Sequence, residues 1–182
     1  ANLDYVDLPE AVIHGRTNMT VEFWLKTQKV GQQAIVSGAN AGQDNEYLLF
    51  LDSENEFRVY RKGQILSWNI FDSDLTNFQW HHFAIVDDAA LDQTTLYVDG
   101  VSQGAKARNI TPLNVQSLLL GQDQDNLGGG FQSAQAFDGQ LAELVVWDTV
   151  RSAADIRKDR AGFFADNDAR LVGHWKFAET SG

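Results

Sequence analysis

The stretch Thr20-Val-Glu-Phe-Trp-Leu-Lys-Thr27 decides the fold class of this 182-residue chain. Val21, Phe23 and Leu25 stand at every second position, and a period of two places them together on one face of a β-strand. Comparable runs, rich in β-branched and aromatic residues, recur between turn residues. They cover Gln33–Ser37, Glu46–Leu51, Glu56–Arg61, Gln64–Ile70, Trp80–Val86, Thr94–Val98, Ser117–Gly121 and Gly139–Trp147. The pattern predicts an all-β chain.

Local signals fix one turn and one helix. Asp99-Gly100 is flanked by strand-like residues, and glycine tolerates the positive φ of a two-residue hairpin. Only Ser152–Arg160 has a helical pattern, with Ser152 as a cap, Asp155 three residues later and Ile156 as the apolar anchor. We expect the charged residues from Asp155 to Arg160 to form a solvated helix face. With 15 glycines, two prolines and no repeat or linker, residues 1–182 are predicted to form a single domain. That domain is expected to be an antiparallel two-sheet sandwich with one short helix near 152–160.

Composition narrows the classes of partner. The chain carries 14 basic and 25 acidic residues, a net charge of −11, which argues against nucleic acid and an anionic membrane surface. No apolar run approaches the roughly 18 residues that a membrane span needs. The absence of cysteine excludes disulfides, thiolate zinc sites and cysteine nucleophiles. Acidic, cysteine-free chains suit a calcium-rich exterior or a bacterial surface, although solubility alone also explains the charge. Because the chain begins at Ala1, we expect it to be part of a larger multidomain protein.

Catalytic signatures are not found in the sequence. His81 and His82 are adjacent, so a strand would direct them to opposite faces. Sandwich glycosidases place paired carboxylates at alternate strand positions. Here Glu143 and Asp148 are five residues apart, which suits plain surface carboxylates. The sequence predicts that the protein is not an enzyme, which leaves a polysaccharide-cleaving jelly roll as a disfavoured alternative.

The segment from Gly121 to Gln135 has the composition of a cation site. Asp123 and Asp125 lie two residues apart in a stretch with little strand propensity, where two carboxylates repel. Calcium takes six to eight oxygen ligands, and Gln132 and Gln135 can add amide oxygens. Three glycines allow the backbone to fold around an ion. A solvated polar turn explains the segment equally well when it is considered alone.

The sequence also resembles a known family over nearly its whole length. Gly121-Gln-Asp-Gln-Asp-Asn-Leu-Gly-Gly-Gly-Phe-Gln, continuing to Trp147-Asp148, resembles the calcium loop and following strand of the pentraxins. Trp80-His-His-Phe and Leu96-Tyr-Val-Asp-Gly100 resemble central strands of the wider laminin-G-like, concanavalin A-like group. The closing Leu171-Val-Gly-His-Trp-Lys-Phe resembles the end of such chains. The resemblance implies a jelly-roll sandwich.

The resemblance also implies a set of calcium ligands. The earlier pentraxin ligands correspond to Asp44 and Asn45, in Asp44-Asn-Glu-Tyr-Leu-Leu-Phe50. One ion would be held by Asp44, Asn45, Asp123, the Gln124 carbonyl and Asp125. A second ion would be held by Asp123, Asp125, Gln132 and Gln135. Three converging carboxylates would be costly without a cation.

Two departures from the family change the expected ligand. Gln132 stands where pentraxins have glutamate, so we expect a weaker second calcium site. The choline pocket of the family contains a phenylalanine, which Phe50 matches. Its later positions, which include a glutamate in the family, fall near Tyr60 and Ile65 here, so the carboxylate is missing. A phosphocholine-type ligand therefore becomes an alternative.

These expectations combine into one functional hypothesis. The sequence predicts a calcium-dependent lectin module of a bacterial surface or secreted adhesin, which binds cell-surface glycans, with fucose a candidate. Asp44, Asn45 and Gln135 are expected to contact both ion and sugar. Tyr60 or Trp68 would pack on an apolar sugar face, with Tyr47 and Phe50 lining the neighbouring strand. A phosphate-ester binder and a structural laminin-G-like spacer are the alternatives.

Overall fold

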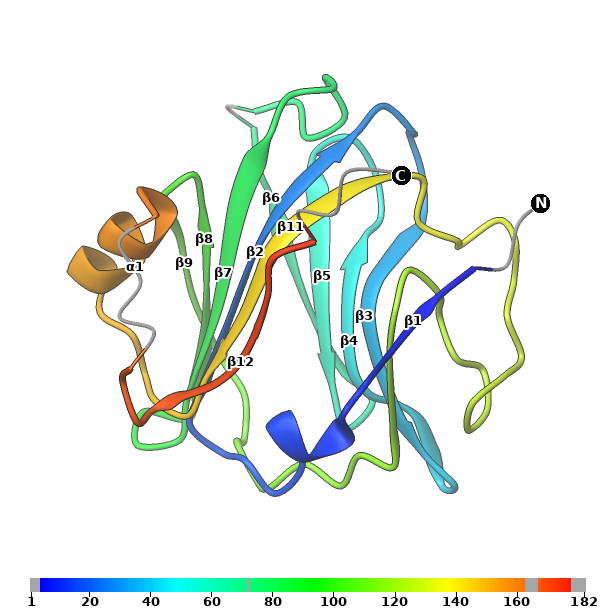
Figure 1. Cartoon of the computed structure of the whole chain (residues 1–182), viewed down its shortest axis with the longest axis horizontal. Coiled ribbons are helices and arrows are strands. Elements are labelled where there is room, and N and C mark those ends of the chain that lie inside the picture. The colour runs from blue at the N-terminus through cyan, green and yellow to red at the C-terminus, as the bar shows by residue number, and fades with distance from the viewer. Residues whose placement is uncertain (1–3, 72, 163–166, 178–182) are drawn as a thin grey trace. The chain divides into compact units, whose positions relative to one another are not determined.

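The computed structural model describes residues 4–71, 73–162 and 167–177 (Figure 1). Two six-stranded sheets dominate it, and the chain divides into two compact units that each hold one sheet. Unit 1 comprises Ala1–Gly15, Thr27–Phe78 and Pro112–Gly139, whereas unit 2 comprises Arg16–Lys26, Gln79–Thr111 and Gln140–Gly182. The expected all-β jelly-roll class with one short helix is confirmed.

The sheet of unit 1 has the strand order β1-β10-β3-β4-β5-β6, and neighbouring strands pair antiparallel throughout. A 3-10 turn, Glu10–Val12, follows its first strand. The β3–β4 pairing shifts register near Ile35 and again near Ala39, where the ladder bends. The strands are β1 (Val6–Leu8), β3 (Gln33–Asn40), β4 (Gln43–Leu51), β5 (Glu56–Arg61), β6 (Gln64–Asn69) and β10 (Ser117–Leu120).

The sheet of unit 2 has the order β12-β11-β2-β7-β8-β9. Its alternation follows the sequence pattern: Val21, Phe23 and Leu25 are 2%, 1% and 0% exposed. The Phe23 ring stacks on Phe83 with centroids 5.3 Å apart. The strands are β2 (Met19–Thr27), β7 (His81–Asp88), β8 (Gln93–Val98), β9 (Val101–Ala107), β11 (Gly139–Trp147) and β12 (Leu171–Trp175).

The helix α1 (Ala153–Arg160) lies beside β7 and β8 of unit 2 (Figure 1). Its Ile156 is fully buried against Ala84 and Val86, which confirms the predicted apolar anchor. The predicted cap is also present, since Ser152 Oγ accepts a hydrogen bond from the Asp155 N–H at 3.2 Å. The expectation of a wholly solvated charged face is wrong, because Asp159 is 1% exposed.

Unit 2 also buries a group of charged side chains that the alternation pattern did not predict. Glu22 and His82 are each 1% exposed or less, and His82 Nε2 lies 3.4 Å from Glu22 Oε2. Arg151 Nε donates to Asp159 Oδ2 at 2.9 Å. Burial, and then the neighbouring Asp159, raise the pKa of Glu22 well above its usual value. Burial lowers the pKa of His82 to about 4, so its imidazole is neutral at physiological pH.

The hairpin predicted at Asp99-Gly100 forms between β8 and β9, with φ values of 51° and 77°. Both residues adopt the left-handed backbone conformation that a type I′ turn requires. No helix in the described ranges is long and apolar enough to cross a membrane.

Candidate functional site

A long loop in unit 1 runs from the end of β10 to the start of β11 and carries most of the predicted ligands (Figure 1). Its two ends are joined, because the Phe137 N–H donates to the Gly121 carbonyl at 2.9 Å. Inside the loop, Gly130 has a φ of +75°, and a Cβ there would lie 2.9 Å from the Cβ of Asp125. Only glycine fits this position, so the chain folds tightly around Asp125.

Asp123 is the electrostatic centre of this loop. It is 6% exposed, and its pKa rises to about 6 because of burial, then the charge of Asp125, and also the charge of Asp44. Hydrogen bonds from the Gln124 backbone and the Ser37 side chain offset part of this rise. Asp44 comes from β4, far away in the sequence. The fold therefore brings three of the predicted carboxylates within electrostatic reach of one another.

Three buried oxygens in unit 1 point to a missing positive partner. Asn45 Oδ1, Asp123 Oδ1 and Gln135 Oε1 are shielded from solvent, and within the described residues they have no hydrogen-bond donor. A buried acceptor without a donor is costly, and the cost falls if a cation takes the place of the donor. All three atoms belong to residues that the sequence predicted as calcium ligands.

Asp44 and Asp125 also line a common surface pocket of about 530 Å³. Asn40, Gln43 and Asn126 contribute to the same wall, so the pocket is bordered mainly by amides and carboxylates. On its loop side, Gln132 Nε2 donates to Asp125 Oδ2 at 2.6 Å. The amide of Gln132 thus binds the carboxylate of Asp125, the residue that the resemblance assigns to both ions.

This donor set fits a hard divalent cation such as calcium, which prefers carboxylate, amide and carbonyl oxygens. Across residues 4–71, 73–162 and 167–177, however, no group of three or more His, Asp or Glu side chains is close enough to hold a metal alone. The expected closed cage of three carboxylates is therefore not formed by acidic side chains. Amide and backbone oxygens would have to complete any coordination sphere here.

The predicted aromatic ligand contacts are mostly buried. Tyr47 is 0% and Phe50 3% exposed, so neither ring offers a face to a ligand, and Trp68 at 2% is likewise enclosed. Only Tyr60 is half-buried; its ring meets Phe50 edge-on, with centroids 6.4 Å apart. The strand pattern could not separate these cases, because the residues of β4 from Glu46 to Leu51 are buried on both faces of the strand.

Sequence reasoning missed the residues that hold the loop in place. Gln124, predicted to contribute its carbonyl, is fully buried and donates from Nε2 to the Ser37 carbonyl at 2.8 Å. Its Oε1 accepts the Gly128 N–H at 2.9 Å. The Lys29 ammonium donates to two loop carbonyls, and burial lowers its pKa, an effect that Asp138 partly offsets. No sequence signal joins these segments, which lie about a hundred positions apart.

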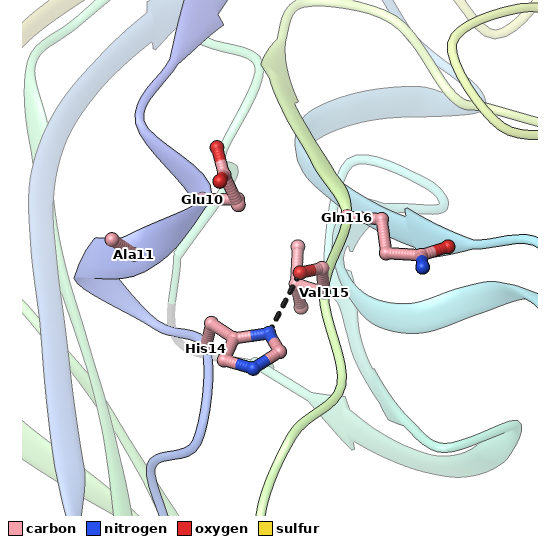
Figure 2. A pocket seen from close by; sticks show the side chains of 5 residues that line it. All are labelled: Glu10, Ala11, His14, Val115 and Gln116. Carbon is pink, nitrogen blue, oxygen red and sulfur yellow. Dashed lines mark hydrogen bonds between the residues drawn. The ribbon is translucent and has the colours of Figure 1, made fainter.

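A second pocket of unit 1, of about 430 Å³, is lined by Glu10, Ala11, His14, Val115 and Gln116. Figure 2 shows the His14 imidazole directed at the Val115 carbonyl, 2.8 Å from Nδ1. Gln116 Oε1 accepts the Ala41 N–H at 3.0 Å, so this amide serves the loop behind it. His14 and Gln116 thus bind neighbouring backbone groups. The buried acceptors and the mutually repelling carboxylates belong instead to the loop around Asp123 and its neighbours, which makes that region the candidate site.

The two-sheet fold and this oxygen-rich loop agree with the family match. Residues 1–157 match the concanavalin A-like lectin/glucanases superfamily, and the chain belongs to it. Within that superfamily the chain is pentraxin-like. It is 29% identical to C-reactive protein 1.1 of Limulus polyphemus over 144 residues, which cover 76% of this chain and 60% of that protein. The chain spans only part of the curated relatives it matches: 60%, 50% and 30% of the length of the first three.

Solved structures show the same fold. A heptameric SAP-like pentraxin from Limulus polyphemus superposes with a TM-score of 0.68 at 21% identity, covering 81% of this chain and 71% of that one. The CBM40 of the Ruminococcus gnavus IT-sialidase, bound to alpha2,3-sialyllactose, superposes with a TM-score of 0.63 at 15% identity. It covers 82% of this chain and 86% of the other. The relatives are thus lectin-like binding proteins.

Proposed function

We propose that this chain is a calcium-dependent carbohydrate-binding domain, in which one or two ions held around Asp123 bridge to sugar hydroxyls. The observation that carries the proposal is the buried Asp123, whose charge is opposed by those of Asp44 and Asp125, together with the buried oxygens of Asn45, Asp123 and Gln135 that have no donor within the described residues. A divalent cation would relieve both penalties at once. The superfamily and the sialyllactose-bound structural relative support a glycan as the ligand.

The adjoining pocket suits hydroxyl groups. Asp44 and Asp125 open onto it, so an ion beside them can exchange water for two neighbouring sugar hydroxyls. Asn40, Gln43 and Asn126 supply amides that can hydrogen-bond the same hydroxyls. Terminal monosaccharides with vicinal hydroxyls, fucose among them, fit this geometry. Of the aromatic candidates, Tyr60 alone retains an accessible edge.

The cellular setting is part of the same proposal. The acidic, cysteine-free composition and the extracellular character of serum pentraxins support a secreted or cell-surface domain. We place it in a bacterial adhesin, as one domain of a larger protein that recognises host or neighbouring-cell glycans.

A phosphate-ester ligand is the second candidate, favoured by the likeness to C-reactive proteins. The position after Tyr60 that faces it across the β5–β6 hairpin is Ile65, which is 53% exposed and carries no charge. A quaternary ammonium would find no carboxylate there, which makes the sugar the better-supported ligand.

A glycan array read in millimolar calcium and again in chelator tests the proposal. We expect a related set of glycans to bind in calcium and to be lost in chelator, because the ion completes the site. Asp125→Asn should lose the signal, whereas Glu54→Gln, an exposed carboxylate elsewhere in unit 1, should keep it. Glycan binding that persists in chelator would contradict the bridging ion. An array on which no glycan binds, together with calcium-dependent binding of phosphocholine, would favour the second candidate.

A further inference from the structure

The side chain of Lys29, in the turn between β2 and β3, binds the backbone of the loop that carries the candidate calcium ligands. Lys29 Nζ donates to the Ala134 carbonyl at 3.0 Å and to the Ala136 carbonyl at 2.6 Å. These two carbonyls flank Gln135, a predicted ligand whose Oε1 is buried and has no donor among the residues that the structure describes. One ammonium group therefore binds the backbone on both sides of a candidate ligand, and charge-assisted bonds are stronger than neutral ones.

The backbone of Lys29 is hydrogen-bonded on both sides of its Cα, which fixes the position from which the side chain extends. Its backbone N–H donates to Thr27 Oγ1 at 3.0 Å, and its carbonyl accepts from Gln33 Nε2 at 2.7 Å. A long lysine side chain ordinarily loses much rotamer freedom when it is fixed. Because the backbone of Lys29 is already fixed on both sides, contact with the loop has to order the side chain alone.

The first two residues of β3, which follow this turn, bind the loop at adjacent positions. The Ala34 N–H donates to the Gln135 carbonyl at 2.9 Å, and Gln33 Oε1 accepts the Asp138 N–H at 3.1 Å. Asp138 is also the charged group that faces Lys29. These contacts connect residues more than a hundred positions apart, and none uses a side-chain oxygen of a predicted calcium ligand.

We propose that Lys29 is a positioning residue for the calcium site, because it fixes the backbone around Gln135 and so orders this arm of the loop before an ion arrives. The inference rests on the proposed calcium-binding function. A loop that is already ordered binds an ion without a further ordering cost, whereas a loop that is ordered only part of the time binds more weakly in proportion. The lysine thereby acts on affinity and leaves the ligand set unchanged.

Calcium titration by calorimetry on the whole chain, with the metal alone, tests this role. Lys29→Met keeps the length of the side chain but removes the charge and the donors. We expect its dissociation constant for calcium to rise by about tenfold with unchanged stoichiometry. Lys29→Arg should retain most of the wild-type affinity, and Lys158→Met, an exposed helix lysine of unit 2, should retain all of it.

Hydrogen–deuterium exchange in chelator supplies a readout that needs no ion. The amides from 131 to 138 should exchange faster in Lys29→Met than in the wild type, while those of α1 stay unchanged. Equal calcium affinity in Lys29→Met and the wild type overturns the positioning role, as does unchanged exchange in this segment. Absence of calcium binding by the wild type overturns the proposed function instead. If Lys29→Met does not fold, Lys29→Arg against Lys29→Gln makes the same comparison of charge.

Discussion

At the scale of single residues, the fold places Asp123 where its ionised form is unfavourable. Burial and two neighbouring aspartates hold its pKa near 6, about two units above the ordinary aspartate value. A folded-state pKa that is raised in this way means that stability is lost as pH rises from the unfolded pKa to the folded one. At neutral pH, without an ion, the aspartate therefore works against folding. Residues of this kind commonly mark binding sites.

Asp123→Asn should separate the binding role of this residue from its structural cost. In chelator at pH 7.5 we expect the free energy of unfolding of the variant to be about 1–2 kcal/mol larger than that of the wild type, because a neutral amide removes the repulsion. In millimolar calcium the order should reverse, since only the wild type gains the binding term RT ln(1 + [L]/Kd). Urea unfolding with and without calcium measures both. A wild type that gains no stability from calcium would contradict the metal site.

Glu22 predicts a second pH dependence, in unit 2. Burial and Asp159 raise its folded pKa, so the wild type should lose stability as pH rises above the ordinary glutamate range, until Glu22 ionises in the folded state. Glu22→Gln keeps a neutral side chain at every pH, so its advantage over the wild type should grow across that interval. His82, whose folded pKa is about 4, costs stability in the opposite direction as pH falls below about 6.5, and this contribution cancels in the difference.

Urea unfolding of both chains from pH 4.5 to 9, with Glu54→Gln as the control, measures the difference for Glu22→Gln. The groups that face Glu22 are His82, Asp159, Arg151 and Trp147, and all of them remain in the variant. Stability curves that run parallel at every pH would show that Glu22 is ionised in the folded protein.

At the scale of elements, the sequence predicts strands well where alternation is strong. Glu56–Arg61 and Gly139–Trp147 were predicted with the bounds the structure has, and most other strands agree within a few residues. Three were missed as strands for physical reasons. β1 has only three residues, β9 is exposed and polar, and β12 contains a glycine. Such strands form because a neighbour offers hydrogen bonds, which local propensity does not encode.

Helix α1 depends on its cap, because it is short and buries few apolar side chains. Ser152→Ala removes the acceptor of the Asp155 N–H, and we expect it to lower the free energy of unfolding by about 1 kcal/mol. Ser133→Ala, at an exposed loop position, is the matched control. Chemical denaturation in chelator measures both variants. A loss for Ser152→Ala no larger than that for Ser133→Ala would mean that the cap contributes little.

At the scale of the whole molecule, the sequence names the candidate ligands but not the residues that hold the loop around them. Asp44, Asp123 and Asp125 were recognisable from residue type, spacing and family resemblance. Lys29, Gln33 and Ser37 act through hydrogen bonds to residues 87 to 107 positions away, and none belongs to a motif. The burial of Tyr47 and Phe50 was likewise invisible, because alternation does not reveal that both faces of a sheet are covered.

The way the chain is threaded through its two units limits how the site can be reused. Each unit is assembled from three separate segments, with segments of the other unit between them along the chain. No single cut in the gene therefore separates the two units, and no short contiguous peptide contains Asp44, Lys29 and the loop together. Any contiguous piece that includes Lys29, Asp44 and the loop also includes residues 79–111 of unit 2, so the candidate site cannot be moved to another scaffold as one segment of unit 1. Diversity for selection is better introduced within the loop than by recombining pieces of the chain.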